Sequence, residues 1–162
     1  MRKFIQKKLK EQKGMTLIEL LAVIVILAII AAIAIPAIGN IIENSRVGAI
    51  KSDAQNIISA GELYFIDNTD ETEVTLKTLV DDNFVEDKGS FEGADDTKVN
   101  VFKSVSATGS TAAVPTKFTG TGKDGKIQVR FVNATKDAIS KYANSDRGSV
   151  TGATGVNAGP AS

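Results

Sequence analysis

The chain has 162 residues, with 19 basic and 19 acidic side chains, and it contains no His and no Cys. This length fits one modest domain plus a special segment. Without His and Cys there is no imidazole base, no thiolate nucleophile, no disulfide framework and no Cys/His zinc site. The composition therefore argues against an enzyme and predicts no cofactor.

The zero net charge hides an asymmetry at the N-terminus. Residues 1–14 carry six basic side chains against the single acid Glu11, a net charge of +5, so the remaining residues sum to −5. Basic residues beside an apolar segment stay on the cytoplasmic side of a membrane, which predicts that the chain beyond the segment faces outward. The six basic leader residues are Arg2, Lys3, Lys7, Lys8, Lys10 and Lys13.

An uninterrupted apolar run follows, from Leu20 to Ile38, and it reads LLAVIVILAIIAAIAIPAI. As a helix it rises about 1.5 Å per residue, and with extension to Ile42 it crosses a hydrocarbon core about 30 Å thick. A buried core helix would need more apolar surface around it than this small chain offers. A cleavable secretory signal usually has an apolar core of only about 7–15 residues. We therefore expect a retained membrane helix.

The apolar run continues into an amphipathic pattern, so one helix is predicted from about Met15 to Phe65. Its apolar positions from Ile38 onward recur every three or four residues, as on one helix face. Pro36 removes a helix hydrogen bond and Gly39 follows it, which predicts either a kinked or locally melted stretch at 36–39 or a curved but intact helix.

Residues 13–19 read KGMTLIE and lie between the basic leader and the apolar run. This combination resembles the prepilin leader of type IV pilins and related pseudopilins. The resemblance implies that a membrane peptidase cuts between Gly14 and Met15 and that the new N-terminus at Met15 is methylated. Glu19 is then the fifth mature residue and Pro36 the twenty-second. Family members usually begin with Phe, and Met15 departs from this.

A carboxylate at bilayer depth costs about 3 kcal/mol or more, so Glu19 needs a partner. The resemblance implies the N-terminal amine of a neighbouring subunit, a pair that would be poorly screened in an apolar filament core. The alternative is that Glu19 only lies at the membrane interface, with its carboxylate in the headgroup region.

The rest of the chain predicts a small α+β head. An acidic break at 67–73 precedes a short helix within 75–85, for which Thr75 is the candidate N-cap. Alternating segments at 98–105, 116–119 and 126–132 predict an antiparallel sheet of two to four strands packed on the helix. Residues 137–142 predict a helical turn. The expected organisation is a leader (1–14), a stem (15–66), a head (67–143) and a flexible tail (144–162), the lollipop outline of pilins.

Three further patterns in the head have a plain and a functional interpretation. The glycines and lysine of 120–126 nearly match a phosphate-binding loop, but Ile127 and a strand follow, which favours a hairpin turn. Acidic groups could ligate calcium, as in some secretion pseudopilins, or simply be solvated. Basic groups could form a weak DNA-binding patch. The acidic groups are Asp67, Asp70, Glu71 and Glu73, then Asp81 and Asp82, then Asp95 and Asp96; the basic ones are Lys103, Lys117, Lys123, Lys126 and Arg130.

These observations predict a structural subunit of a type IV pilus, made as a single-pass membrane precursor and polymerised into a cell-surface filament. The alternatives are a pseudopilin of a competence (DNA-uptake) or type II protein secretion system and, more distantly, a membrane-anchored binding module that does not polymerise. The expected partners are other copies of the chain, the prepilin peptidase and methyltransferase, the assembly platform with its minor pilins, and the membrane before assembly.

Overall fold

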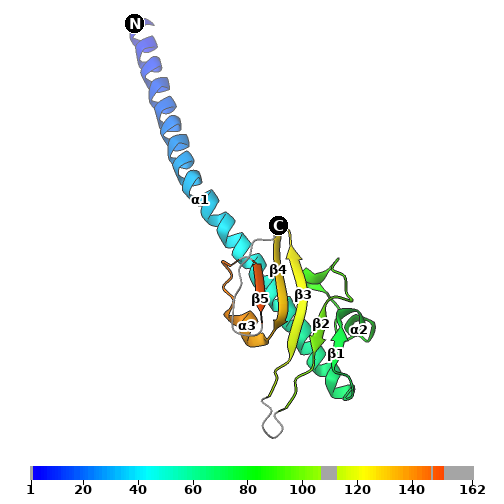
Figure 1. Cartoon of the computed structure of the whole chain (residues 1–162). Helices are drawn as coiled ribbons and strands as arrows, with labels where there is room; N and C mark the ends of the chain where they lie inside the picture. Colours follow the sequence, from blue (N-terminus) through cyan, green and yellow to red (C-terminus); the bar gives the residue numbers. More distant parts are fainter. Residues whose placement is uncertain (1, 107–112, 147, 152–162) are drawn as a thin grey trace. The chain divides into compact units, whose positions relative to one another are not determined.

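The computed structural model describes residues 2–106, 113–146 and 148–151, with side chains from residue 17 onward. It divides into two compact units, Met1–Ile42 and Glu43–Ser162. Helix α1 (Arg2–Asp67) contributes its first part to one unit and its second part to the other. The first unit is this helix alone. The second is an α+β head, the fold class that the sequence predicts (Figure 1).

Helix α1 is longer than the predicted Met15–Phe65 and includes the leader. Pro36 lies inside it, and the residues around Pro36 and Gly39 are assigned to the helix without a break. Proline removes one N–H donor, but the flanking turns keep their own hydrogen bonds. Of the two predicted outcomes at 36–39, the single chain therefore adopts the intact helix rather than a melted stretch.

The head contains one five-stranded sheet in the order β1-β2-β3-β4-β5. Strands β1 (Glu73–Thr75), β2 (Asn100–Phe102), β3 (Lys117–Asp124) and β4 (Ile127–Ala134) pair antiparallel, whereas β5 (Gly148–Thr151) pairs parallel with β4. The prediction of two to four antiparallel strands is thus wrong in number and in one direction. Helix α3 (Lys136–Lys141) lies between β4 and β5 in the chain, and a crossover of this kind allows parallel pairing.

The β3–β4 hairpin is the longest ladder of the sheet. Asp124 pairs with Ile127 across a two-residue turn, and Gly125 has a φ of 60°. A positive φ at the first turn position favours glycine and is typical of tight hairpin turns. The register shifts between Phe118 and Gly120, opposite Asn133, which also has a positive φ of 49°. This is a β-bulge, which increases the local twist of the sheet.

The short helices begin at threonine caps. Helix α2 (Leu76–Asp81) starts after Thr75, whose side chain accepts a hydrogen bond from the Thr78 amide, as predicted from the sequence. Thr135 caps α3 in the same way through the Ala138 amide. A 3-10 turn, η1 (Gly89–Phe91), lies between α2 and β2.

The core of the head lies between α1 and the inner face of the sheet. The buried stripe on α1 starts at Val47 and ends at Phe65, so the apolar periodicity is confirmed there, whereas Ile38, Ile41 and Ile42 are exposed. Phe91, Phe118 and Phe131 form a cluster of mutually close rings beneath the sheet. At the other end, buried Gly61 allows α1 to approach the side chain of Val101 on β2 closely.

Candidate functional site

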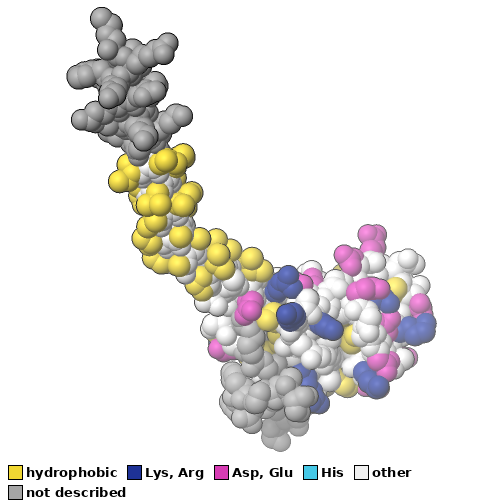
Figure 2. Space-filling model, turned by 90° about the horizontal axis from the view of Figure 1, so that it is seen from above, with side chains coloured by type: hydrophobic (Ala, Val, Ile, Leu, Met, Phe, Trp, Pro, Cys, Tyr) yellow, Lys and Arg dark blue, Asp and Glu magenta, His cyan; other side chains and the backbone are white. Residues whose placement is uncertain are grey.

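The first candidate site is the apolar part of α1 that precedes the head. Between Leu17 and Ile42 the large apolar side chains are between 49% and 70% exposed, and none is buried by another part of the chain that the structure describes. Figure 2 shows the helix as an uninterrupted apolar surface. The helix is long and apolar enough to cross a membrane. A surface of this size and composition requires lipid or protein to cover it.

Glu19 is the single charged residue between positions 17 and 42, and its side chain is exposed on the helix. It lies close to the beginning of the apolar stretch. Without a partner, its carboxylate would be costly in any apolar environment that covers its neighbours. A cation supplied from outside the chain would offset this cost, because the sequence between 17 and 42 provides none.

The predicted cleavage position lies inside α1. Gly14 and Met15 have helical backbones, as do the basic leader residues between Arg2 and Lys13. The backbone at the predicted cleavage bond is therefore helical and not extended. Processing at this bond would require local unwinding, and glycine lowers the cost of unwinding relative to alanine.

The second half of α1 holds the head through polar residues beside its buried stripe. The Asp53 carboxylate accepts hydrogen bonds from the Ser90 amide (2.7 Å) and hydroxyl (2.6 Å) of η1. Lys51 donates to the Tyr142 carbonyl (2.5 Å) and to the Asn144 side chain (3.0 Å). These contacts join the 3-10 turn and the α3–β5 connection to the helix.

Two ion pairs fix other segments to the same helix. Arg46 lies 3.6 Å from the Asp124 carboxylate at the β3–β4 hairpin, and Glu62 accepts from Lys136 of α3 at 2.5 Å. The two residues of each pair are far apart in the sequence, so no local pattern predicts the pairing. The sequence shows only that Arg46 and Glu62 flank the apolar stripe of the helix.

The electrostatics of the head reflect local contacts. Partial burial lowers the pKa of Lys51. Hydrogen bonds from Lys98 and Thr97 lower the pKa of Asp95 to about 2, and the bond to Asp95 raises the pKa of Lys98. Both partners of the Asp95–Lys98 pair therefore favour their charged forms.

The structure also places the other candidate residues of the sequence analysis. The phosphate-loop-like glycines at 120–125 belong to β3 and its tight turn, which is the hairpin interpretation. Asp95 pairs with Lys98, and Asp96 with Lys88 at 2.5 Å. Within the described ranges, no three acidic side chains converge as a metal site would require. Of the basic residues, Lys103 contacts the Thr69 carbonyl and lies over the Phe65 ring.

Comparison with protein families gives one match. Residues 9–35 match the model of the prokaryotic N-terminal methylation motif, the prepilin signature of type IV pilins and pseudopilins. Searches of curated proteins and of solved structures found no match. The matched range contains Gly14, Met15 and Glu19, and it ends just before Pro36. The motif and the exposed apolar helix together support a membrane-anchored precursor of the pilin or pseudopilin type.

Proposed function

We propose that this chain is the structural subunit of an extracellular type IV pilus. The prepilin peptidase cuts between Gly14 and Met15 on the cytoplasmic side, Met15 is methylated at its new amine, and the processed chain leaves the membrane by joining a helical filament. The N-terminus of the precursor is cytoplasmic and the head lies outside, because the basic leader precedes the apolar helix.

One observation carries this proposal. The chain exposes an apolar helix that its own head does not cover, and the one carboxylate on that surface is four residues after the N-terminus that processing creates. A free amine at Met15 of one copy is the cation that Glu19 of the next copy needs. In an apolar filament core the attraction is poorly screened, so it selects one stagger between neighbouring helices.

Burial of residues 17–42 against neighbouring copies supplies the driving force for assembly. Removal of apolar surface from water stabilises by roughly 25 cal/mol per Å². The gain is smaller on leaving lipid, where close packing of small residues dominates instead. Several alanines between 28 and 37 suit such packing. Filament growth is then favoured over a lone helix in the membrane.

The test measures the intact mass of the protein in filaments sheared from cells, for the wild type, Glu19→Ala and the control Asp137→Ala. Asp137 is an exposed carboxylate on α3. We expect a chain that starts at methylated Met15, filaments in the wild type and the control, and none in Glu19→Ala, with the variant retained in the membrane. A chain that still starts at Met1 and forms no filaments would indicate a non-polymerising anchored module instead, and filaments that form without Glu19 would refute the role of this carboxylate in assembly.

The same motif occurs in pseudopilins of competence and type II secretion systems. The location of the assembled protein distinguishes a pilus subunit from these pseudopilins. A pilus subunit should form the bulk of long surface filaments that can be sheared from the cell. A pseudopilin should stay within the cell envelope, and its deletion should abolish DNA uptake or protein secretion without loss of long filaments.

A further inference from the structure

The head separates its charges along the chain. Residues 67–97 contain eleven Asp and Glu against two Lys, a net charge of −9, whereas residues 98–151 contain nine Lys and Arg against three Asp, a net charge of +6. In the fold, the acidic part comprises β1, α2 and η1, and the basic part comprises β2 to β5 with α3. Figure 2 shows one group of Lys and Arg on the visible face of the head, and other Lys and Arg side chains interspersed with Asp and Glu.

Four basic residues share the β3–β4 hairpin: Lys117, Lys123, Lys126 and Arg130. Buried Val129 and Phe131 alternate with exposed Arg130 along β4, so Arg130 lies on the face of the sheet directed away from the core. The register places Arg130 beside Thr121 and Lys123 beside Gln128. The face is therefore polar and basic.

These four cations differ from most other lysines of the head, although Lys103 also has no acidic partner in the described part of the chain and donates to the Thr69 carbonyl. Among the residues that the structure describes, none of the four forms an ion pair, whereas Lys77, Lys88, Lys98, Lys136 and Lys141 each have an Asp or Glu partner. The hairpin's own acid, Asp124, faces Arg46 of α1. We name the surface formed by Lys117, Lys123, Lys126 and Arg130 the basic hairpin face.

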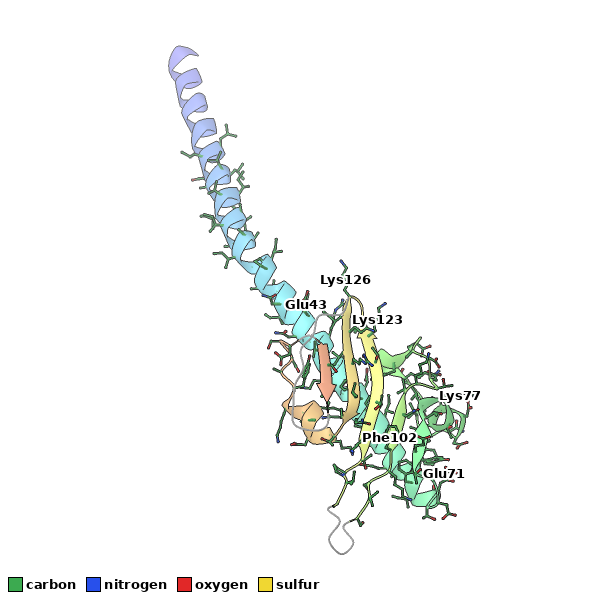
Figure 3. All side chains as sticks on the ribbon, viewed as in Figure 1. Glu43, Glu71, Lys77, Phe102, Lys123 and Lys126 are labelled. Carbon is green, nitrogen blue, oxygen red and sulfur yellow. The ribbon has the colours of Figure 1, made fainter. Side chains whose placement is uncertain are left out.

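An acidic counterpart follows α1. Asp67, Asp70, Glu71 and Glu73 are exposed, and within the described part of the chain they take part in no ion pair. We name residues 67–73 the acidic segment. Figure 3 shows Lys123 and Lys126 at the turn end of the hairpin and Glu71 at the opposite end of the sheet. Lys123 and Lys126 of one copy therefore lie away from its own Glu71, whereas Lys117 shares a row of the sheet with Glu73, since both pair with Phe102.

We propose that the acidic segment of one copy docks on the basic hairpin face of the next copy in the filament. The contact uses two different surfaces of the same chain, so it is heterologous and can repeat without closing, as filament growth requires. Complementary charges at such a contact fix register and suppress wrong neighbours. This inference rests on the proposed function and adds a head-to-head contact to the packing of the helices.

Because a single exposed ion pair contributes little, the contact needs several pairs and should weaken with salt. The test uses the full chain in cells that make filaments. Lys123→Glu/Lys126→Glu reverses the basic face, Glu71→Lys/Glu73→Lys reverses the acidic segment, and a third strain carries both pairs. Lys77→Glu/Lys141→Glu is the control, with the same change of charge on α2 and α3.

We expect each single reversal to lower the yield of sheared filaments at least tenfold and to make the remaining filaments fall apart in moderate salt. The strain with both reversals should regain most of the yield, and the control should match the wild type. Unfolding temperatures of the purified variants, measured in parallel, show whether each head is folded.

The proposal is overturned if folded, processed Lys123→Glu/Lys126→Glu gives wild-type filaments, or if the double reversal recovers nothing. It is also overturned if Lys123→Glu/Lys126→Glu leaves filaments intact and abolishes only their binding to duplex DNA. The basic hairpin face would then be a binding site for a polyanion and not for a second copy of the chain. A wild type that makes no filaments would instead refute the proposed pilus function itself.

Discussion

The packing of α1 on the sheet is most sharply tested at Gly61. A Cβ atom added there would lie 2.7 Å from Cγ1 and 2.8 Å from Cβ of Val101 on β2, closer than carbon atoms approach in proteins. Gly61→Ala gains about 1 kcal/mol from helix propensity but forces α1 and β2 apart, and overpacking of this kind costs about 1–3 kcal/mol. We expect a net loss of up to about 2 kcal/mol in the free energy of unfolding of the head.

Gly48→Ala is the matched control on the same helix. There the added Cβ would meet only the end of the Asn144 side chain, at 3.1 Å, so we expect stability equal to or slightly above that of the wild type. The assay is thermal unfolding of the full chain in detergent, where a loss of about 1 kcal/mol lowers the midpoint by about 4 °C.

Val101→Ala tests whether the loss of stability in Gly61→Ala comes from contact with Val101. It should cost less in the Gly61→Ala chain than in the wild type, because it removes the two Cγ atoms that the new methyl group meets and leaves only Cβ. A Gly61→Ala head as stable as the wild type, or strictly additive effects of the two substitutions, would refute this account of the contact.

Other contacts give three further predictions. Asp53→Ala leaves the Ser90 amide without its acceptor and should lower the free energy of unfolding by about 1–2 kcal/mol by denaturant titration, more than Ser90→Ala. Gly125→Ala places a Cβ at positive φ and 1.7 Å from Nη1 of Arg46, so it should cost about 1–2 kcal/mol in the same titration. The pKa of Asp95 is depressed to about 2, so its stabilising contribution is full above its ordinary value of 3.8 and is lost as the pH falls through about 2. Asp95→Asn should therefore lower the unfolding temperature at pH 7 and match the wild type near pH 2.

The sequence predicts the elements that have a strong local signal. The apolar run, the buried stripe from Val47 and the alternation of 126–132 each have a clear period, and Thr75 has the position of an N-cap before an apolar helix. The match to the methylation motif covers Gly14, Met15 and Glu19, whose roles stay predictions. In these places local sequence and tertiary structure favour the same conformation.

The missed elements are short strands at the two edges of the sheet. Strand β5 occurs in a stretch rich in Gly and Ser, where Val150 is the one large apolar residue, and this composition reads as a flexible tail. Its pairing with β4 depends on the crossover through α3, a long-range effect without a local signature. Strand β1 has three residues in an acidic segment, with Val74 alone buried. The rest of the predicted tail, 152–162, lies outside the described residues.

The apolar side chains of the two parts of α1 are covered in different ways. Substitutions in one part therefore affect folding of the head, and substitutions in the other affect assembly. From Val47 to Phe65 the apolar stripe is covered by the chain's own sheet, so substitutions there, or at their polar neighbours such as Asp53, act on the stability of the head. From Leu17 to Ile42 nothing in the described chain covers the apolar side chains. Substitutions there should therefore leave the folded head intact and affect the packing of the helix against neighbouring copies in the filament. Glu19 belongs to this second class, because it supports no contact within the fold that the structure describes. A variant at Glu19 should therefore unfold at the wild-type temperature and still fail to polymerise, a combination that a merely structural role for this carboxylate would not produce.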